Sequence, residues 1–209
     1  KSKLGFIVTG SCRLDLYRKG GDSMMGRYFL YRIHPLSIAE LVRTEMPAQP
    51  ISTPVKISNE AMHALLEFGG FPEPFIKQDK RFYNRWQLLR KQQIIREDIR
   101  DLTQIQEISQ LELLASLLQY NVGQLRNYSD LALKTRNSDQ TIRRWIDVLK
   151  SCYYCFTLKP WSRNIPRSLI KEPKLYLWDW SIVKDKGARL ENFVASHLLK
   201  AIDFWNDSG

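Results

Sequence analysis

The sequence has no P-loop: no stretch reads GxxxxGK followed by Ser or Thr, the pattern whose backbone N–H groups and lysine hold nucleotide phosphates. No apolar run approaches the ~20 residues of a membrane-spanning helix, so we expect no membrane partner. Cysteine and histidine are scarce, with three of each. Within these 209 residues, a P-loop hydrolase and a membrane span are excluded, and no metal site is predicted.

Two of the cysteines have CxxC spacing, which is found in zinc and redox sites. The stretch Cys152-Tyr153-Tyr154-Cys155 lies in an apolar run, however, and no second CxxC or CxxH accompanies it. We interpret both cysteines as small core residues on a strand in a reducing cytosol. This interpretation predicts a cytoplasmic location.

Basic residues outnumber acidic ones, with 32 Lys and Arg against 22 Asp and Glu and a net charge of +10. Charge of this sign attracts phosphate groups. The segment from 111 to 171 has four acidic residues and ten basic ones, an excess of six. The basic residues are Arg126, Lys134, Arg136, Arg143, Arg144, Lys150, Lys159, Arg163, Arg167 and Lys171.

The first part of the chain predicts an α/β arrangement. Leu4–Thr9 is a short apolar run typical of a buried parallel strand, and Arg27–Ile33 alternates enough to be a second strand. A buried parallel strand needs neighbours on both sides, so we expect the chain to be the middle of a larger protein. Ser37 is placed to cap a short helix, Ile38–Arg43.

The rest of the chain predicts a mainly helical structure. Ser58 caps a helix that ends at Gly69-Gly70, and Phe82–Leu102 forms a long charged helix. Its inner positions are predicted to be Trp86, Leu89, Ile95 and Ile99.

Three helices and two strands follow. The helices are predicted at Leu111–Tyr120, Ser129–Arg136 and Asp139–Ser151, and the strands at Cys152–Leu158 and Lys174–Trp180. In the third helix, apolar residues recur at the spacing of one helix face, namely at Ile142, Trp145, Ile146 and Leu149. Three helices followed by a two-stranded hairpin form a winged-helix arrangement. A last helix, Gly187–Ala201, is predicted to bury Leu190, Phe193, Val194, His197 and Leu198.

Several short motifs resemble one family. They are Ile7-Val8-Thr9-Gly10-Ser11, Gly26-Arg27-Tyr28, His34-Pro35-Leu36-Ser37, Gly69-Gly70-Phe71-Pro72-Glu73-Pro74, Arg96-Glu97-Asp98-Ile99-Arg100-Asp101-Leu102 and Gly187-Ala188-Arg189-Leu190-Glu191-Asn192. Their order is similar to that in prokaryotic AAA-type ATP-binding proteins with a C-terminal winged helix and a domain like the PD-(D/E)XK nucleases. The resemblance implies four parts: the end of a P-loop ATPase sheet (1–50), a helical lid or linker (51–105), a winged helix (106–183) and the first helix of a nuclease-like domain (184–209).

The resemblance implies a catalytic role in a full-length parent that binds ATP and Mg²⁺, with this chain inactive alone. Ser11 or Thr9 would sense the γ-phosphate and orient water. Arg27 would reach the nucleotide of a neighbouring subunit, which implies a homo-oligomer. For Ser11 or Thr9 the alternative is a hydroxyl that hydrogen-bonds within its own turn, and for Arg27 it is a surface arginine or an ion pair within the chain. Glu191 would join a metal site only with residues that are absent from this sequence.

The winged helix suggests duplex DNA as a partner. Arg143 and Arg144 lie on the predicted outer face of the third helix, where they would contact phosphates or base edges. The residues that would extend this patch are Arg126, Lys134, Lys150, Lys159, Arg163 and Arg167. Winged helices also dock onto proteins or onto neighbouring domains, so a binding module with no role for nucleotide is the alternative.

Overall fold

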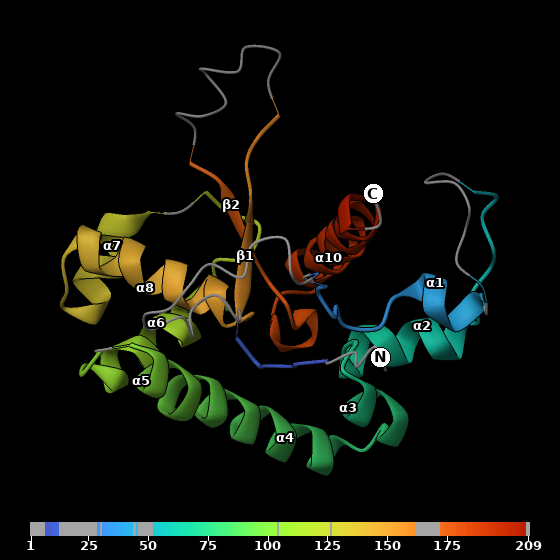
Figure 1. Cartoon of the computed structure of the whole chain (residues 1–209), viewed down its shortest axis with the longest axis horizontal. Helices are drawn as coiled ribbons and strands as arrows, with labels where there is room; N and C mark the ends of the chain where they lie inside the picture. The colour runs from blue at the N-terminus through green and yellow to red at the C-terminus, as the bar shows by residue number, and fades with distance from the viewer. Residues whose placement is uncertain are drawn as a thin grey trace, which may run out of the picture.

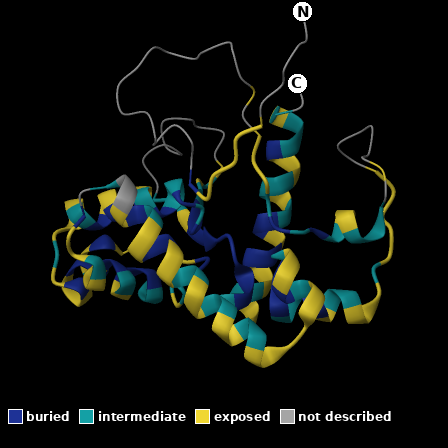
Figure 2. Ribbon diagram, turned by 60° about the horizontal axis from the view of Figure 1, so that its bottom comes forward, coloured by how far each residue is buried: buried dark blue, intermediate teal, exposed yellow. Residues whose placement is uncertain are grey.

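A computed structural model describes residues 7–12, 29, 31–43, 45, 52–103, 105–125, 127–161 and 172–207, without the side chains of 101 and 102. In these residues the chain is mostly helical and has one sheet, of two antiparallel strands (Figure 1). Buried residues gather where the helices meet these strands (Figure 2). The mainly helical class expected for the larger part of the chain is confirmed.

Three short helices form one end of the molecule: α1 (Ile38–Val42), α2 (Asn59–Phe68) and α3 (Pro72–Lys77). The predicted cap at Ser58 is confirmed, because its side chain accepts a hydrogen bond from the Ala61 N–H. The helix ends at Gly69, whose φ of 79° favours glycine. A small core here consists of Leu65, Trp180 and Phe193, which come from distant parts of the chain.

A long helical body connects this end to the rest of the molecule (Figure 1). It runs through α4 (Lys80–Gln92), the π-helical segment η2 (Gln93–Asp98) and α5 (Ile99–Leu102). Ile95 and Ile99 are fully buried as predicted, but Leu89 is 54% exposed, so that prediction was wrong. A π turn contains more residues than an α turn, so a single α-helical period cannot place the inner face on both sides of η2.

The main core is built from α6 (Ile108–Leu118), α7 (Tyr128–Thr135), α8 (Asp139–Ser151), β1 (Cys155–Leu158) and β2 (Lys174–Leu177). The strands pair antiparallel, with Cys155 opposite Leu177 and Leu158 opposite Lys174. All four predicted apolar positions of α8 are buried. Burying this stripe holds α8 against α7 and β1 and leaves its other face to solvent.

The chain then crosses from the main core to the small one. Trp178 packs in the main core, whereas Trp180, in the 3₁₀ segment η3 (Trp180–Ile182), packs in the small core. The Trp180 indole N–H donates to the Leu65 carbonyl at 2.7 Å. The final helix, α10 (Lys186–Asp207), covers both β2 and η3.

The predicted inner face of α10 was largely wrong. Phe193 is buried, but Leu190, Val194 and Leu198 are between 48% and 59% exposed. The buried positions are instead mostly polar or small, namely Asn192, Ala195, Ser196 and Asp203. Their hydrogen bonds to the rest of the protein offset the cost of burial, and hydropathy alone does not show this.

The two strands predicted near the start of the chain are absent from its described part. Residues 7–9 and 31–33 form no strand, and the sheet of the described residues contains only β1 and β2. Ile7 is 95% exposed and Ile33 is 89% exposed, so neither side chain lies in a sheet core here. Residues 4–6, 27–28 and 30 lie outside the described part.

The cysteines depart from their predicted role. Cys152 and Cys155 are both buried as expected, and Cys155 begins β1. Cys152, however, caps the end of α8 rather than lying on a strand, and it forms a disulfide with Cys12. Because 140 residues separate Cys12 from Cys152, spacing gives no sign of the pairing.

Candidate functional site

α7 and α8 are joined by a three-residue turn, as in a helix-turn-helix motif. Arg136 adopts the left-handed conformation (φ 56°, ψ 46°), which ends α7. Ser138 then begins α8, because its side chain accepts from the Thr141 N–H at 3.1 Å. The turn and the cap together fix the angle at which α8 leaves α7.

Three of the predicted DNA-contacting cations are held in ion pairs on this surface. Lys134 lies 2.7 Å from Asp130 and Lys150 lies 2.9 Å from Asp147. The Arg143 guanidinium lies 3.2 Å from a Glu172 carboxylate oxygen and 3.6 Å from the centre of the Tyr128 ring. Exposed pairs of this kind contribute about 0–1 kcal/mol, so another anion can replace the carboxylates at little cost.

Three other cations of this region are exposed without an ion pair to any residue that the structure describes. They are Arg136 in the turn, Arg144 on α8 and Lys159 just after β1. Arg126, Arg163, Arg167 and Lys171 lie outside the described part. Between 111 and 171 the structure therefore describes six basic and four acidic residues, an excess of two. The other four basic residues of this segment are the undescribed ones.

Of the predicted catalytic residues, the structure describes only two. Thr9 and Ser11 are both exposed, and Arg27 lies outside the described residues. Among the residues the structure describes, no three His, Cys, Asp or Glu side chains are grouped to hold a metal ion.

Glu191 has local partners instead of a metal site. It accepts from the Tyr176 hydroxyl at 2.8 Å and pairs with Lys174 at 3.0 Å. The Tyr176 hydrogen bond, followed by the contacts with Lys174, holds the pKa of Glu191 below its usual range. In this structure Glu191 therefore ties the first turns of α10 to β2.

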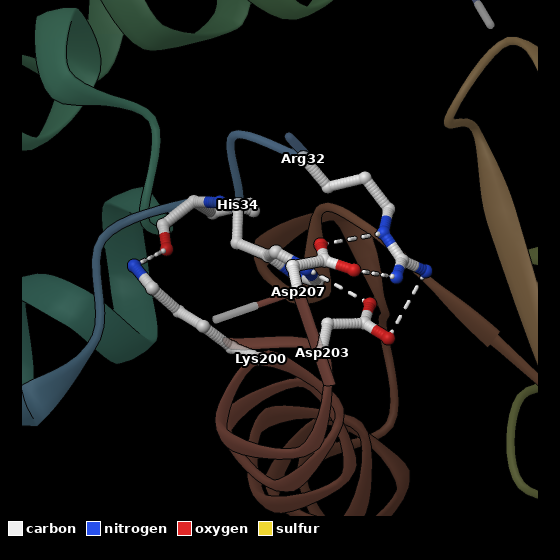
Figure 3. A network of polar contacts seen from close by, with 6 residues as sticks. Arg32, His34, Lys200, Asp203 and Asp207 are labelled. Atoms are coloured by element: carbon white, nitrogen blue, oxygen red, sulfur yellow. Dashed lines mark hydrogen bonds and ion pairs between the residues drawn. The ribbon is translucent and has the colours of Figure 1, made fainter. Parts of the chain in front are cut away.

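Sequence reasoning missed a polar network that docks the segment before α1 onto the end of α10 (Figure 3). Arg32 pairs with Asp203 at 3.0 Å and with Asp207 at 2.8 Å. His34 lies 3.0 Å from the same Asp203, and Lys200 donates to the Pro35 carbonyl at 2.9 Å. These pairs join residues at least 165 positions apart, so no local pattern could reveal them.

His197 takes part in the same docking and is partly buried. Its Nε2 accepts from the Ile38 N–H at 3.0 Å, and its Nδ1 lies 2.8 Å from the Phe193 carbonyl. Both bonds form when the ring is neutral and Nδ1 carries the proton. Burial lowers the pKa of His197 from its ordinary value of 6.5, which favours that neutral form.

A protein family described as "Domain of unknown function (DUF8612)" matches residues 59–188, well over half of the chain. The chain belongs to this family. The DUF8612 match begins at the first residue of α2 and ends in the first turn of α10. The α7–α8 pair, both strands and the long α4–α5 body therefore all belong to the family domain.

Two curated relatives are similar over more of the chain. They are the uncharacterized proteins Mb2031c of Mycobacterium bovis and Rv2008c of Mycobacterium tuberculosis, each 22% identical over 178 residues. These alignments cover 85% of this chain but 37% of each relative. No solved structure matches. No helix in the described residues is both long and apolar enough to cross a membrane.

Proposed function

We propose that this chain is a linking and docking part of a prokaryotic AAA-type ATP-binding protein, and that its α6–β2 region is a winged helix that binds duplex DNA. The observation that carries the proposal is α8. Its apolar face is buried against the core, while its polar face, just after the three-residue turn from α7, is open to solvent. This is the placement that lets a second helix enter a major groove.

The charges around α8 favour a phosphate-rich partner. In the described structure, no carboxylate pairs with Arg136, Arg144 or Lys159. These side chains could therefore bind a DNA phosphate without breaking an existing ion pair. Arg143 and Lys150 lie on the same helix and would exchange exposed, weak pairs for phosphate contacts. The resulting affinity would depend strongly on salt, because counterions leave the DNA.

The test is a fluorescence-anisotropy titration of a labelled duplex at several KCl concentrations. We expect Arg136→Ala with Arg144→Ala to weaken binding and to reduce the salt slope by roughly 0.9 for each phosphate that the variant no longer neutralises. The matched control is Arg81→Ala with Arg85→Ala, which removes two exposed arginines from α4, away from the turn. Equal affinity and slope in both double variants would refute the DNA proposal.

The second candidate, docking onto a protein or onto another domain of the parent, is favoured by the acidic groups on the same surface. Asp139, Asp147 and Glu172 alternate with the cations around α8, and a DNA partner would be repelled by them. This candidate predicts that the wild-type chain shows no duplex binding even at low salt.

The nucleotide part of the proposal concerns the full-length parent. We propose that the parent binds ATP and Mg²⁺, that Ser11 or Thr9 senses the γ-phosphate and that Arg27 acts across a subunit interface. An ATPase assay should then show turnover for a longer protein with a P-loop and none for this chain. Arg27→Ala should lower turnover in the longer protein, and light scattering should show that protein as a homo-oligomer. Turnover by the chain alone would refute this part.

A further inference from the structure

A cavity of about 430 Å³ lies where α4 faces α6 and the segment around η3. Its walls carry charged and amide side chains, including Gln87, Arg90 and Lys91 from α4, Asp179 before η3 and Lys184 after it. Tyr120, Tyr153 and Ile182 also line it. A volume of this size accommodates a small organic ligand rather than a single ion.

Arg90 is the central group of this cavity. Its guanidinium lies 3.6 Å from the centre of the Phe71 ring and 5.4 Å from that of Trp86. Stacking on rings satisfies the face of a guanidinium but leaves its N–H edge free to donate. In the described structure that edge makes no hydrogen bond and no ion pair, although burial lowers the pKa of Arg90.

Two neighbours of Arg90 also have donors to spare. The Gln87 side-chain nitrogen is buried and lacks a hydrogen-bond partner among the described residues. The Lys91 ammonium donates to the Ser116 hydroxyl at 2.7 Å, which uses one of its three protons. A buried donor without an acceptor is rare in proteins and costs free energy, so the Gln87 nitrogen, beside the N–H groups that Arg90 and Lys91 still have to offer, points to a missing acceptor.

The acid in the cavity does not supply that acceptor. Asp179 forms no ion pair with Arg90, and its Oδ1 accepts instead from the backbone N–H and the hydroxyl of Ser181. Against this one carboxyl stand three cations, Arg90, Lys91 and Lys184, so the lining has an excess of at least two positive charges. An excess of this size matches a dianion such as a phosphomonoester better than a single carboxylate.

The backbone next to the cavity is also unusual. The π-helical segment η2 begins directly after the pocket-lining part of α4, and its Ile94 lines the cavity. Short π segments inside α-helices occur frequently at functional sites.

From these contacts we infer that the cavity binds a small organic phosphate, whose phosphoryl oxygens accept from Arg90 and Gln87 while Lys91 and Lys184 balance its charge. The organic part lies against Tyr120 and Tyr153. Such a ligand would contact α4, α6 and the η3 segment together, and so couple the long helical body to the α6–β2 region. The inference does not depend on DNA binding or on ATP hydrolysis in the parent.

The experiment is isothermal titration of the whole chain at constant ionic strength. The probes are inorganic phosphate, adenosine 5′-monophosphate, adenosine and succinate. We expect one saturable site for the phosphate-bearing probes, with adenosine and succinate much weaker. Arg90→Met should weaken phosphate binding roughly tenfold or more, as expected for loss of a charged hydrogen-bonding group. Lys184→Ala, on the exposed rim, should weaken it roughly threefold.

Two control variants remove cations that do not line the cavity: Arg85→Met on α4 and Lys186→Ala beside Lys184. Both should leave the affinity within a factor of about two of the wild type. If Arg90→Met loses its helical circular dichroism, Lys184→Ala against Lys186→Ala decides the matter. The inference is overturned by no saturable phosphate binding, by equal weakening in the controls, or by adenosine or succinate binding as tightly as the phosphates.

Discussion

Asn192 shows what one buried side chain does in this fold. The Leu177 N–H donates to its Oδ1 and its Nδ2 donates to the Leu177 carbonyl, both at 2.8 Å. The amide thus takes the place of a neighbouring strand beside β2. It also donates to the Ser196 hydroxyl at 3.1 Å, so every polar atom of this fully buried side chain has a partner.

Replacing Asn192 with Leu should therefore be costly. The substitution leaves the N–H and the carbonyl of Leu177 buried without partners, and we expect a loss of about 3 kcal/mol or more in the free energy of unfolding. Urea unfolding followed by circular dichroism measures this. Asn206→Ala, at an exposed position on the same helix, should change stability by about 0.5 kcal/mol or less. Similar losses in the two variants would contradict the role assigned to Asn192.

His197 makes stability depend on pH. Burial, with a smaller contribution from Lys200, keeps the pKa of His197 below 6.5 in the folded chain, so the unfolded chain binds the proton more readily. Its contribution to stability is therefore present above pH 6.5 and is lost as the pH falls through the folded pKa. Burial also lowers the pKa of His34, despite the nearby Asp203, so His34 acts in the same direction.

We expect the free energy of unfolding to fall between pH 7 and pH 5, and His197→Gln to make this fall shallower. Urea titrations at half-unit pH steps measure both slopes. His63→Gln, at a highly exposed position on α2, is the control and should leave the slope unchanged. An unchanged slope in His197→Gln would show that its ring does not control the transition.

At the scale of elements, the approach of three segments depends on Gly70. The Leu36 N–H donates to its carbonyl at 2.6 Å. A Cβ at Gly70 would lie 2.6 Å from the Leu36 carbonyl oxygen and 2.5 Å from the Trp180 ring, both too close for a real contact. Because backbone and a buried indole cannot move aside cheaply, no side chain fits between α2, η3 and the segment before α1.

Gly70→Ala should thus separate these elements and destabilise the small core by about 2 kcal/mol or more. The matched control is Gly187→Ala in the first turn of α10, where the nearest atom to a new Cβ is a carboxylate oxygen of Asp185 at 3.3 Å. Its thermal midpoint should stay near that of the wild type. If Gly70→Ala unfolds at the wild-type temperature in differential scanning calorimetry, the packing argument is wrong.

At the scale of the whole molecule, the Cys12–Cys152 disulfide joins the start of the described chain to the end of α8. Closing a loop of this length lowers the entropy of the unfolded chain and stabilises the folded state by roughly 2–5 kcal/mol. Cys12 is therefore tied covalently to the α7–α8 region.

Thiol labelling checks this tie. The denatured, unreduced chain should take up label at one cysteine, Cys155, and at all three after reduction. Under oxidising conditions, Cys12→Ser should have a lower urea midpoint than the wild type. Its midpoint should equal that of the reduced wild type. Labelling of three cysteines without reduction would show that the bond is absent.

Local chemistry by itself determined much of this protein. The cap at Ser58, the buried stripe of α8 and the two strands near Cys155 and Lys174 could all be predicted, because each depends on residues a few positions apart. The tertiary structure alone decided which face of α10 is buried, that Arg143 meets Glu172, that Arg32 meets Asp203 and that Arg90 lines a cavity. These contacts join residues far apart in the chain, and their partners are set by how the helices pack, which no local period encodes.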